Sequence, residues 1–461
     1  MSAVGVLGRR HALTERDGRL GGYHHGSDNR SISEIPAERI ERVARRDRPL
    51  PQRDDRRGES VDIENPELVA TSKPQAKVFF PNLDGLRFFA FFVVFLSHGF
   101  GSLPKLFDFA PRLRDALFES GGLGVAFFFT LSGFLITYLI LHEIAVTGTI
   151  DVRAFYIRRT LRIWPLYYLV IIFAFVVYPL IKSFLGFGSY IEAGSPLYYI
   201  FFLGNFDVIR MGQNHGAQIT NITWSVAIEE QFYLCWPLLF LFIKPRFYKF
   251  IFPIIILGSL AFRFANLDRG MVLYFHTLSV ISDMAVGGLG AFLAATSIRF
   301  KEFFREIPRS YILLAYGAGF LLVVLHGRLF ASSVLPAFER LALSFFFVFI
   351  LLEQNYCRRS PLKISQLRRI SKLGSYTYGL YLLHPVALLV VNNTLRILKL
   401  DSAGIANGLF IGTVGLFVSI ALSAASYHCY ERKFLTLKER FAHVKSGSGY
   451  EGVKPGRLLD G

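Results

Sequence analysis

Long apolar runs separated by short polar segments dominate the chain from about residue 80 onward. These runs cover residues 86–103, 122–142, 163–182, 224–243, 248–264, 278–296, 311–326, 340–354, 376–392 and 405–428. A run of about 20 apolar residues is long enough to cross the hydrocarbon core of a bilayer as a helix. The pattern therefore predicts an all-α integral membrane protein with about ten transmembrane helices.

One further apolar segment, residues 197–203, is too short to span a membrane. Pro196 precedes it and Gly204 follows it. A helix this short cannot cross a hydrocarbon core of about 30 Å. We interpret the segment as interfacial or re-entrant.

Basic residues concentrate in alternate loops, which predicts the topology. Lys and Arg favour the cytoplasmic side of membrane proteins. With ten spans, the basic loops share one side, whereas a span at 197–203 would invert every later loop. The sequence therefore predicts a multi-pass protein of the bacterial cytoplasmic (inner) membrane, with both termini cytoplasmic and residues 205–222 outside. The basic loops contain Arg153, Arg158, Arg159 and Arg162; Lys244, Arg246 and Lys249; Arg299, Lys301, Arg305 and Arg309; and Arg358, Arg359, Lys363, Arg368, Arg369 and Lys372.

The net charge of +17 comes mostly from these loops and indicates contact with anionic membrane lipid rather than nucleic acid. Residues 1–78 carry similar numbers of acidic and basic side chains, with many Gly and Pro, and we expect this hydrophilic N-terminal region to be disordered. Residues 79–435 form the predicted transmembrane domain, and 436–461 a basic cytoplasmic tail. The three cysteines show no disulfide framework, and no segment has metal-ligand spacing, so no metal is expected.

Arg87 and His98 lie within the first apolar run, where ionisable groups are costly and usually functional. Eleven positions correspond to about 16 Å of helix rise and about three turns, so both side chains face one side. His384 occupies the middle of a later run, just before Pro385. A packed, hydrogen-bonded His384 and a catalytic His384 fit the sequence equally well.

Two other segments place charged groups at membrane boundaries. Arg158, Arg159 and Arg162 crowd one helical turn, where they could determine topology or bind an anion, since the guanidinium group suits phosphate oxygens. Glu229 and Glu230 lie one to two turns into a predicted span, which favours a functional role. The small residues of 121–133 are explained by close helix packing alone.

Five sequence blocks occur in a fixed order along residues 79–435. They are LDGLR at 83–87 with His98, the block from Phe128 to Ile136, the block from Arg158 to Pro165, the block from Trp224 to Tyr233 and the block from Ser375 to Pro385. Ser426, Tyr427 and Glu431 follow. In this order the blocks resemble the membrane-bound acyltransferase-3 family, the bacterial surface-polysaccharide O-acyltransferases.

The resemblance implies a cytoplasmic acyl-CoA donor, commonly acetyl-CoA, and a carbohydrate hydroxyl as acceptor. It implies that His98 acts as a base or an acyl carrier, with Arg87, Glu229 and His384 as further catalytic candidates and Arg158, Arg159 and Arg162 binding the donor. Glu229 is preferred to Glu230. The family commonly has an arginine two residues before Asp283, where this chain has Ile281. A secreted small molecule such as a macrolide is an alternative acceptor, and a membrane transporter is the competing class of function.

Overall fold

Helices make up almost all of the chain that the computed structural model describes, which comprises residues 77–78, 80–100, 121–186, 190–212, 219–400, 404–441 and 445–446. The only other regular elements among the described residues are two parallel two-residue strands, β1 (Lys77–Val78) and β2 (Lys445–Ser446). The prediction of an all-helical protein is confirmed. The prediction of a disordered N-terminal region concerns residues 1–78, of which 1–76 lie outside the described residues.

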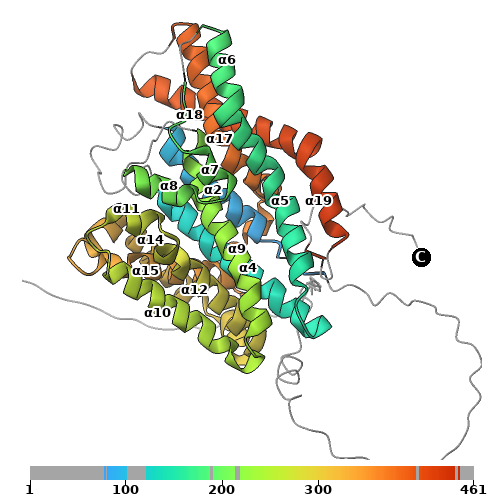
Figure 1. The fold of residues 1–461 in the computed structure, drawn as a ribbon. Coiled ribbons are helices and arrows are strands. Elements are labelled where there is room, and N and C mark those ends of the chain that lie inside the picture. Colours follow the sequence, from blue (N-terminus) through green and yellow to red (C-terminus); the bar gives the residue numbers. More distant parts are fainter. Residues whose placement is uncertain are drawn as a thin grey trace, which may run out of the picture. The chain divides into compact units, whose positions relative to one another are not determined.

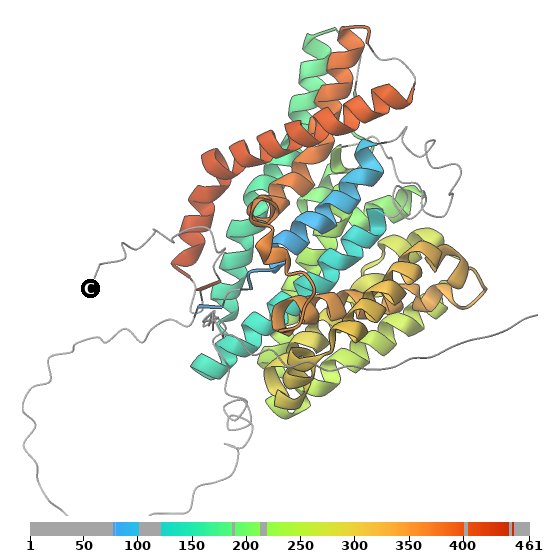
Figure 2. The same ribbon diagram turned by 180° about the vertical axis from the view of Figure 1, so that it is seen from behind.

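The helices form three neighbouring groups (Figures 1 and 2). The central group contains α2 (Leu83–Gly99), α4 (Gly121–Thr147) and α9 (Thr223–Phe242). On one side of it lie α10 (Tyr248–Phe264), α11 (Gly270–Phe275), α12 (Thr277–Thr296), α13 (Ile298–Glu306), α14 (Arg309–Leu329) and α15 (Pro336–Tyr356). On the other lie α5 (Val152–Ile172), α6 (Tyr178–Phe184), α17 (Thr377–Ile397), α18 (Ile405–Ser426) and α19 (Arg432–Glu439).

Shorter elements complete the order. They are α7 (Pro196–Ile200), α8 (Gly204–Met211), α16 (Arg368–Gly374), the 3₁₀ turns η4 (Ile219–Ile222), η5 (Pro245–Phe247) and η6 (Ile364–Gln366), and the π-helical turns η3 (Phe173–Val177) and η7 (Tyr427–Glu431). Because η3 joins α5 to α6 and η7 joins α18 to α19, each pair forms one longer helical segment.

Seven helical segments of the described chain are long and apolar enough to cross a membrane. They are Gly121–Thr147, Val152–Phe184, Pro245–Phe264, Gly270–Thr296, Arg309–Leu329, Thr377–Ile397 and Ile405–Glu439. The three other predicted runs coincide with α2, α9 and α15. Of these, α2 has 17 described residues, and both α9 and α15 carry acidic side chains. The count of ten spans therefore stays a prediction.

The segment predicted to be too short for a span, residues 197–203, contains most of α7, and α8 follows directly after it. Polar contacts attach these helices to the rest of the bundle. Asn205 of α8 donates a hydrogen bond to the Phe275 carbonyl, and Gln231 of α9 donates to both Asn205 and the Phe202 carbonyl. This anchoring to α9 and α11 fixes a short helical segment that cannot cross the membrane by itself.

The helices α4 and α12 approach closely because glycines face each other's backbone. A Cβ atom added to Gly133 would overlap the Met284 carbonyl oxygen, and one added to Gly287 would overlap the Thr130 carbonyl oxygen. Small residues at such crossings let membrane helices pack backbone to backbone. The contact fixes Ser132, which belongs to the same turn of α4 as Gly133.

We expect Gly287→Ala to destabilise the protein strongly. The added methyl group meets backbone rather than a movable side chain, and overpacking of this kind costs roughly 1–3 kcal/mol or more. Thermal unfolding in detergent should show a lowered midpoint. Gly258→Ala is the control, because Gly258 lies in helix α10 with no atom within 4 Å of its added Cβ. Equal midpoints for the two variants would contradict the proposed backbone contact.

Asp283, whose expected arginine neighbour is replaced by Ile281, has a partner from another helix. Arg340 of α15 forms an ion pair with one Asp283 oxygen, and Ser344 Oγ donates to the other at 2.8 Å. Asp283 is completely buried and Arg340 nearly so. Because a buried charge needs a counter-charge, α15 supplies the cation that residue 281 lacks.

Candidate functional site

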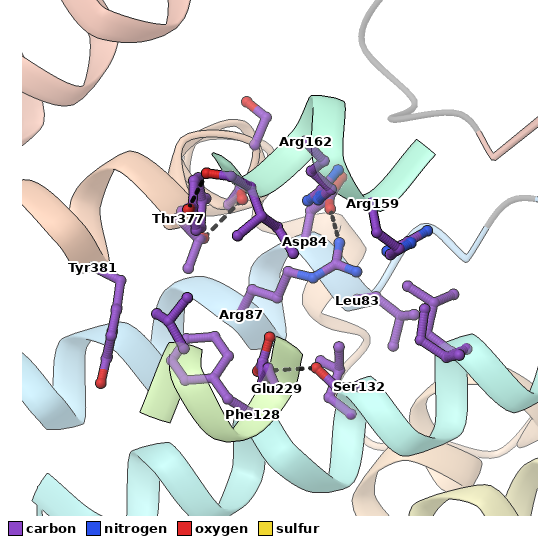
Figure 3. A pocket seen from close by; sticks show the side chains of 18 of the residues that line it. Leu83, Asp84, Arg87, Phe128, Ser132, Arg159, Arg162, Glu229, Thr377 and Tyr381 are labelled. Atoms are coloured by element: carbon purple, nitrogen blue, oxygen red, sulfur yellow. Dashed lines mark hydrogen bonds and ion pairs between the residues drawn. The ribbon is translucent and has the colours of Figure 1, made fainter. Parts of the chain in front are cut away.

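A cavity of about 440 Å³ lies where α2, α4, α5, α9, α17 and α19 meet (Figure 3). We call it the arginine cavity. Apolar residues form much of its wall, but its charged lining consists of Asp84, Arg87, Arg159, Arg162, Glu229, Lys438 and Glu439. In the view of Figure 3, Arg87 lies between the two other arginines and Glu229. Such a mixture of apolar wall and convergent polar groups is typical of a ligand site.

Arg87 is held by a carboxylate one turn earlier on the same helix. Its Nη1 donates to Asp84 Oδ1 at 2.7 Å, and both side chains are mostly buried. The spacing of three residues brings them to one face of α2. This pair neutralises Arg87 while leaving the remaining guanidinium donors available to the cavity.

The three clustered arginines separate into two groups. Arg159 and Arg162 both line the arginine cavity, since positions three apart share one face of a helix. Arg158 is rotated by roughly 100° from Arg159. Its Nη2 donates to Glu143 Oε2 at 2.9 Å and its Nη1 to the Phe441 carbonyl at 2.8 Å. The structure therefore brings together two of the three predicted donor-binding arginines, with Arg158 outside the cavity lining.

The two adjacent glutamates also face different surroundings. Glu229 lines the arginine cavity and accepts hydrogen bonds from Ser132 Oγ at 3.1 Å and Tyr233 Oη at 2.9 Å. Glu230 accepts from Trp164 Nε1 at 3.1 Å and does not line the cavity. Of the two glutamates, only Glu229 lines this cavity, and its preference as the functional one stays a prediction.

A second cavity, of about 260 Å³, lies beyond the first along α2, and we call it the histidine cavity. Its lining includes Ser97, His98, Trp224 and Tyr274. Val125 and Tyr381 line both cavities. Arg87 and His98 thus belong to the same helix but to successive cavities, about 16 Å apart along its axis.

His98 and His384 form a hydrogen-bonded pair at this second cavity. His98 Nδ1 lies 2.9 Å from His384 Nε2, and the two rings lie edge to edge with centroids 5.2 Å apart and planes within 10° of parallel. His384 is completely buried, whereas His98 is partly exposed to the cavity. The pair joins helices α2 and α17 across 286 positions of sequence.

The partners of His384 determine which nitrogens carry protons. Its Nδ1 faces the Tyr381 carbonyl oxygen at 2.7 Å and the Leu380 carbonyl oxygen at 3.2 Å, so this nitrogen must be the donor. In a neutral ring Nε2 is then an acceptor, and the hydrogen of the pair belongs to His98 Nδ1. His98 Nε2 is consequently unprotonated, and its lone pair is free to take up a proton.

Several residues of the two cavities have no obvious signal in the sequence. Ser132 and Tyr233 became candidates through their bonds to Glu229, and Lys438 through its place in the cavity wall. Tyr381 became one because it lines both cavities and its hydroxyl lies 2.7 Å from Ser225 Oγ. The matched blocks contain Ser132, Tyr233 and Tyr381, but block membership does not indicate which side chains face the site. Lys438 lies outside every block.

Among the described residues, no three His, Cys, Asp or Glu side chains gather as a metal site would require. The polar groups of both cavities instead suit proton transfer and anion binding.

Comparison with known proteins agrees with the family resemblance seen in the sequence blocks. A protein of Staphylococcus aureus strain COL with the provisional name O-acetyltransferase is 34% identical over 230 residues, covering 47% of this chain and 35% of its own length. The O-acetyltransferase OatA of S. aureus strain NCTC 8325 is 31% identical over 230 residues, with the same coverage. The chain thus spans about a third of the length of these relatives. No solved structure matches significantly. The model of the acyltransferase domain family matches residues 80–428, well over half of the chain, and the protein belongs to this family.

Proposed function

We propose that this protein is a membrane O-acyltransferase that moves an acyl group, most simply acetyl, from cytoplasmic acyl-CoA to a hydroxyl of an exported or cell-surface polysaccharide. The observation that carries the proposal is the arrangement of the two cavities. One is lined by cations suited to a phosphorylated donor, the other holds an unprotonated histidine nitrogen, and they share Val125 and Tyr381. Transfer takes place at this junction.

The donor occupies the arginine cavity in this proposal. Arg159 and Arg162 bind phosphate oxygens through charge-assisted hydrogen bonds, and the apolar wall contacts the pantetheine arm. Arg87 is held by its bond to Asp84, and Glu229 is held by its bonds from Ser132 and Tyr233. These residues position the thioester near the shared wall.

The acceptor hydroxyl enters the histidine cavity and donates its proton to His98 Nε2. Its oxygen forms a bond to the thioester carbonyl carbon, the carbon–sulfur bond breaks, and the departing thiolate takes the proton from the imidazolium ring. The products are an ester and free CoA. His384 stabilises the positive charge that develops on His98, because its Nε2 accepts the hydrogen bond from His98 Nδ1.

A hydroxyl acceptor and an acetyl group are supported by the names of the relatives, which are O-acetyltransferases. The predicted topology supports the direction of transfer. Helix ends predicted as cytoplasmic supply Asp84, Arg159 and Thr377 to the arginine cavity, and those predicted as extracytoplasmic supply His98, Gly121 and Trp224 to the histidine cavity. Donor and acceptor would then approach from opposite sides of the inner membrane. In the same topology both chain termini are cytoplasmic.

The direct test supplies radiolabelled acetyl-CoA to the cytoplasmic face of membrane vesicles that contain the protein and its host's glycan. We expect label in the glycan as an alkali-labile O-acetyl ester, and loss of the O-acetyl proton NMR signal from the glycan of a deletion strain. A glycan identical in wild-type and deletion strains would overturn the polysaccharide acceptor. Absence of any transfer from acetyl-CoA would overturn the acyltransferase proposal.

The topology leads to a separate labelling prediction. In a variant whose three cysteines are replaced by serine, Thr149→Cys should react with an impermeant maleimide only after the cells are permeabilised, and Met211→Cys should react in intact cells. Thr149 is exposed just beyond the end of α4, and Met211 is half-buried at the last position of α8. The basic loop that contains Arg158 follows Thr149 and is expected inside. The reverse labelling pattern would contradict the orientation and with it the side from which the donor enters.

A further inference from the structure

Three cations meet at one end of the arginine cavity without an ion pair to any described residue. They are Arg159 and Arg162 of α5 and Lys438 of α19, which is half-buried. Nε of Arg159 is buried without a hydrogen-bond partner, and its guanidinium group lies 5.7 Å from the ring centroids of both Phe155 and Tyr233. All three side chains line the cavity, so this end of it is positively charged and suits an anion.

The carboxylates of the same cavity do not compensate these charges directly. Asp84 pairs with Arg87, and Glu229 accepts from Ser132 and Tyr233. Glu439 also lines the wall, but its side chain is exposed. Like charges held together repel. A ligand with several negative charges therefore lowers the electrostatic energy of the three cations in this wall. A ligand with more than one phosphate group meets this condition.

Arg158 determines where Lys438 can lie. It donates to the carbonyl of Phe441, which follows the end of α19 by two residues, and to Glu143 of α4. The chain just beyond Lys438 is therefore attached to α4 through a buried ion pair. Arg158 acts on the cavity indirectly, as the residue that holds α19 against it.

We propose that Lys438 binds a phosphate group of the acyl donor together with Arg159 and Arg162, and that Arg158 with Glu143 positions α19 for this contact. The inference rests on the proposed function and adds to it a donor-binding residue from the end of the chain. Lysine suits this place because its flexible ammonium group can follow a phosphate as a point charge. The donor class is a nucleotide thioester with several phosphates.

Equilibrium binding of radiolabelled CoA to the full-length protein in nanodiscs tests the proposal without relying on activity. Loss of a charged phosphate contact should weaken binding about tenfold or more in Lys438→Ala. Lys438→Met, which keeps the length but removes the charge, should weaken it equally, and Lys438→Arg should retain most of the affinity. Lys433→Ala is the matched control, because Lys433 is exposed on the same helix and does not line the cavity.

Arg158→Ala and Glu143→Gln should also weaken CoA binding, and combining either with Lys438→Ala should add little, since both act through the same contact. The KM for acetyl-CoA should rise in all of these variants with kcat nearly unchanged. Wild-type protein that binds CoA but transfers no acyl group would refute the proposed function alone. Active wild-type protein with unchanged CoA affinity in Lys438→Ala and Lys438→Met would refute this inference alone.

Discussion

Replacing His98 with glutamine is expected to abolish acyl transfer while leaving the protein inserted and folded. Glutamine can keep a hydrogen bond to His384, but it cannot take up a proton near neutral pH. Loss of a general base costs about 10²- to 10⁴-fold in rate. The O-acetyl signal of the exported glycan should disappear by proton NMR, and the rate in membrane vesicles should fall within this range.

The control for the His98 variant is its level in the membrane and its affinity for CoA, which should both match the wild type because His98 lines only the histidine cavity among the two described. Full activity of His98→Gln would remove His98 from the mechanism. If His98 is instead an acyl carrier, wild-type protein incubated with labelled acetyl-CoA alone should retain label that hydroxylamine releases, and the base mechanism predicts no such retention.

Replacing His384 with alanine should give the second largest loss of activity. Without the acceptor at His384 Nε2, His98 is no longer fixed as the tautomer with an unprotonated Nε2, and its imidazolium form loses a partner. We expect kcat to fall by about 10- to 100-fold with the KM for acetyl-CoA unchanged, the size of loss seen when the hydrogen-bond partner that orients a metal-binding histidine is removed. Steady-state kinetics in vesicles measure both constants.

The conservative variant His384→Gln should recover part of this loss, because its amide oxygen can accept from His98 Nδ1. The double variant His98→Gln/His384→Ala should be no slower than His98→Gln alone, since His384 acts through His98. A fully active His384→Ala would mean that His384 serves packing only, and additive losses in the double variant would mean that His384 does not act through His98.

The elements of the fold were largely predictable from local pattern. Runs of apolar residues coincide with the long helices, and the segment between Pro196 and Gly204 forms only the short helix α7 before α8 begins. The short helix α19, which extends past residue 435 to Glu439, was not predicted from the sequence. The helix there begins after a π-helical turn and lacks the apolar pattern that signals a span.

The identity of the candidate residues and their order along the chain were predictable. Ionisable groups within apolar runs are rare, and the matched blocks contain most of the candidates. The sequence alone therefore determined the family, the helical class and a short set of candidates that included Arg87, His98, Glu229 and His384. Each of these depends on local information: the apolar context of a single run, or residues that stand next to one another.

Their arrangement was decided by tertiary structure. Packing of α2 against α17 brings His98 to His384 and thereby assigns the tautomer of each ring. Arg158 and Arg159 are neighbours in sequence but point apart, because successive side chains on a helix differ by roughly 100° and the packing of α4 and α19 selects which one faces the cavity. Lys438 joins the site from the far end of the chain for the same reason: contacts between distant helices leave no trace in the pattern of either one.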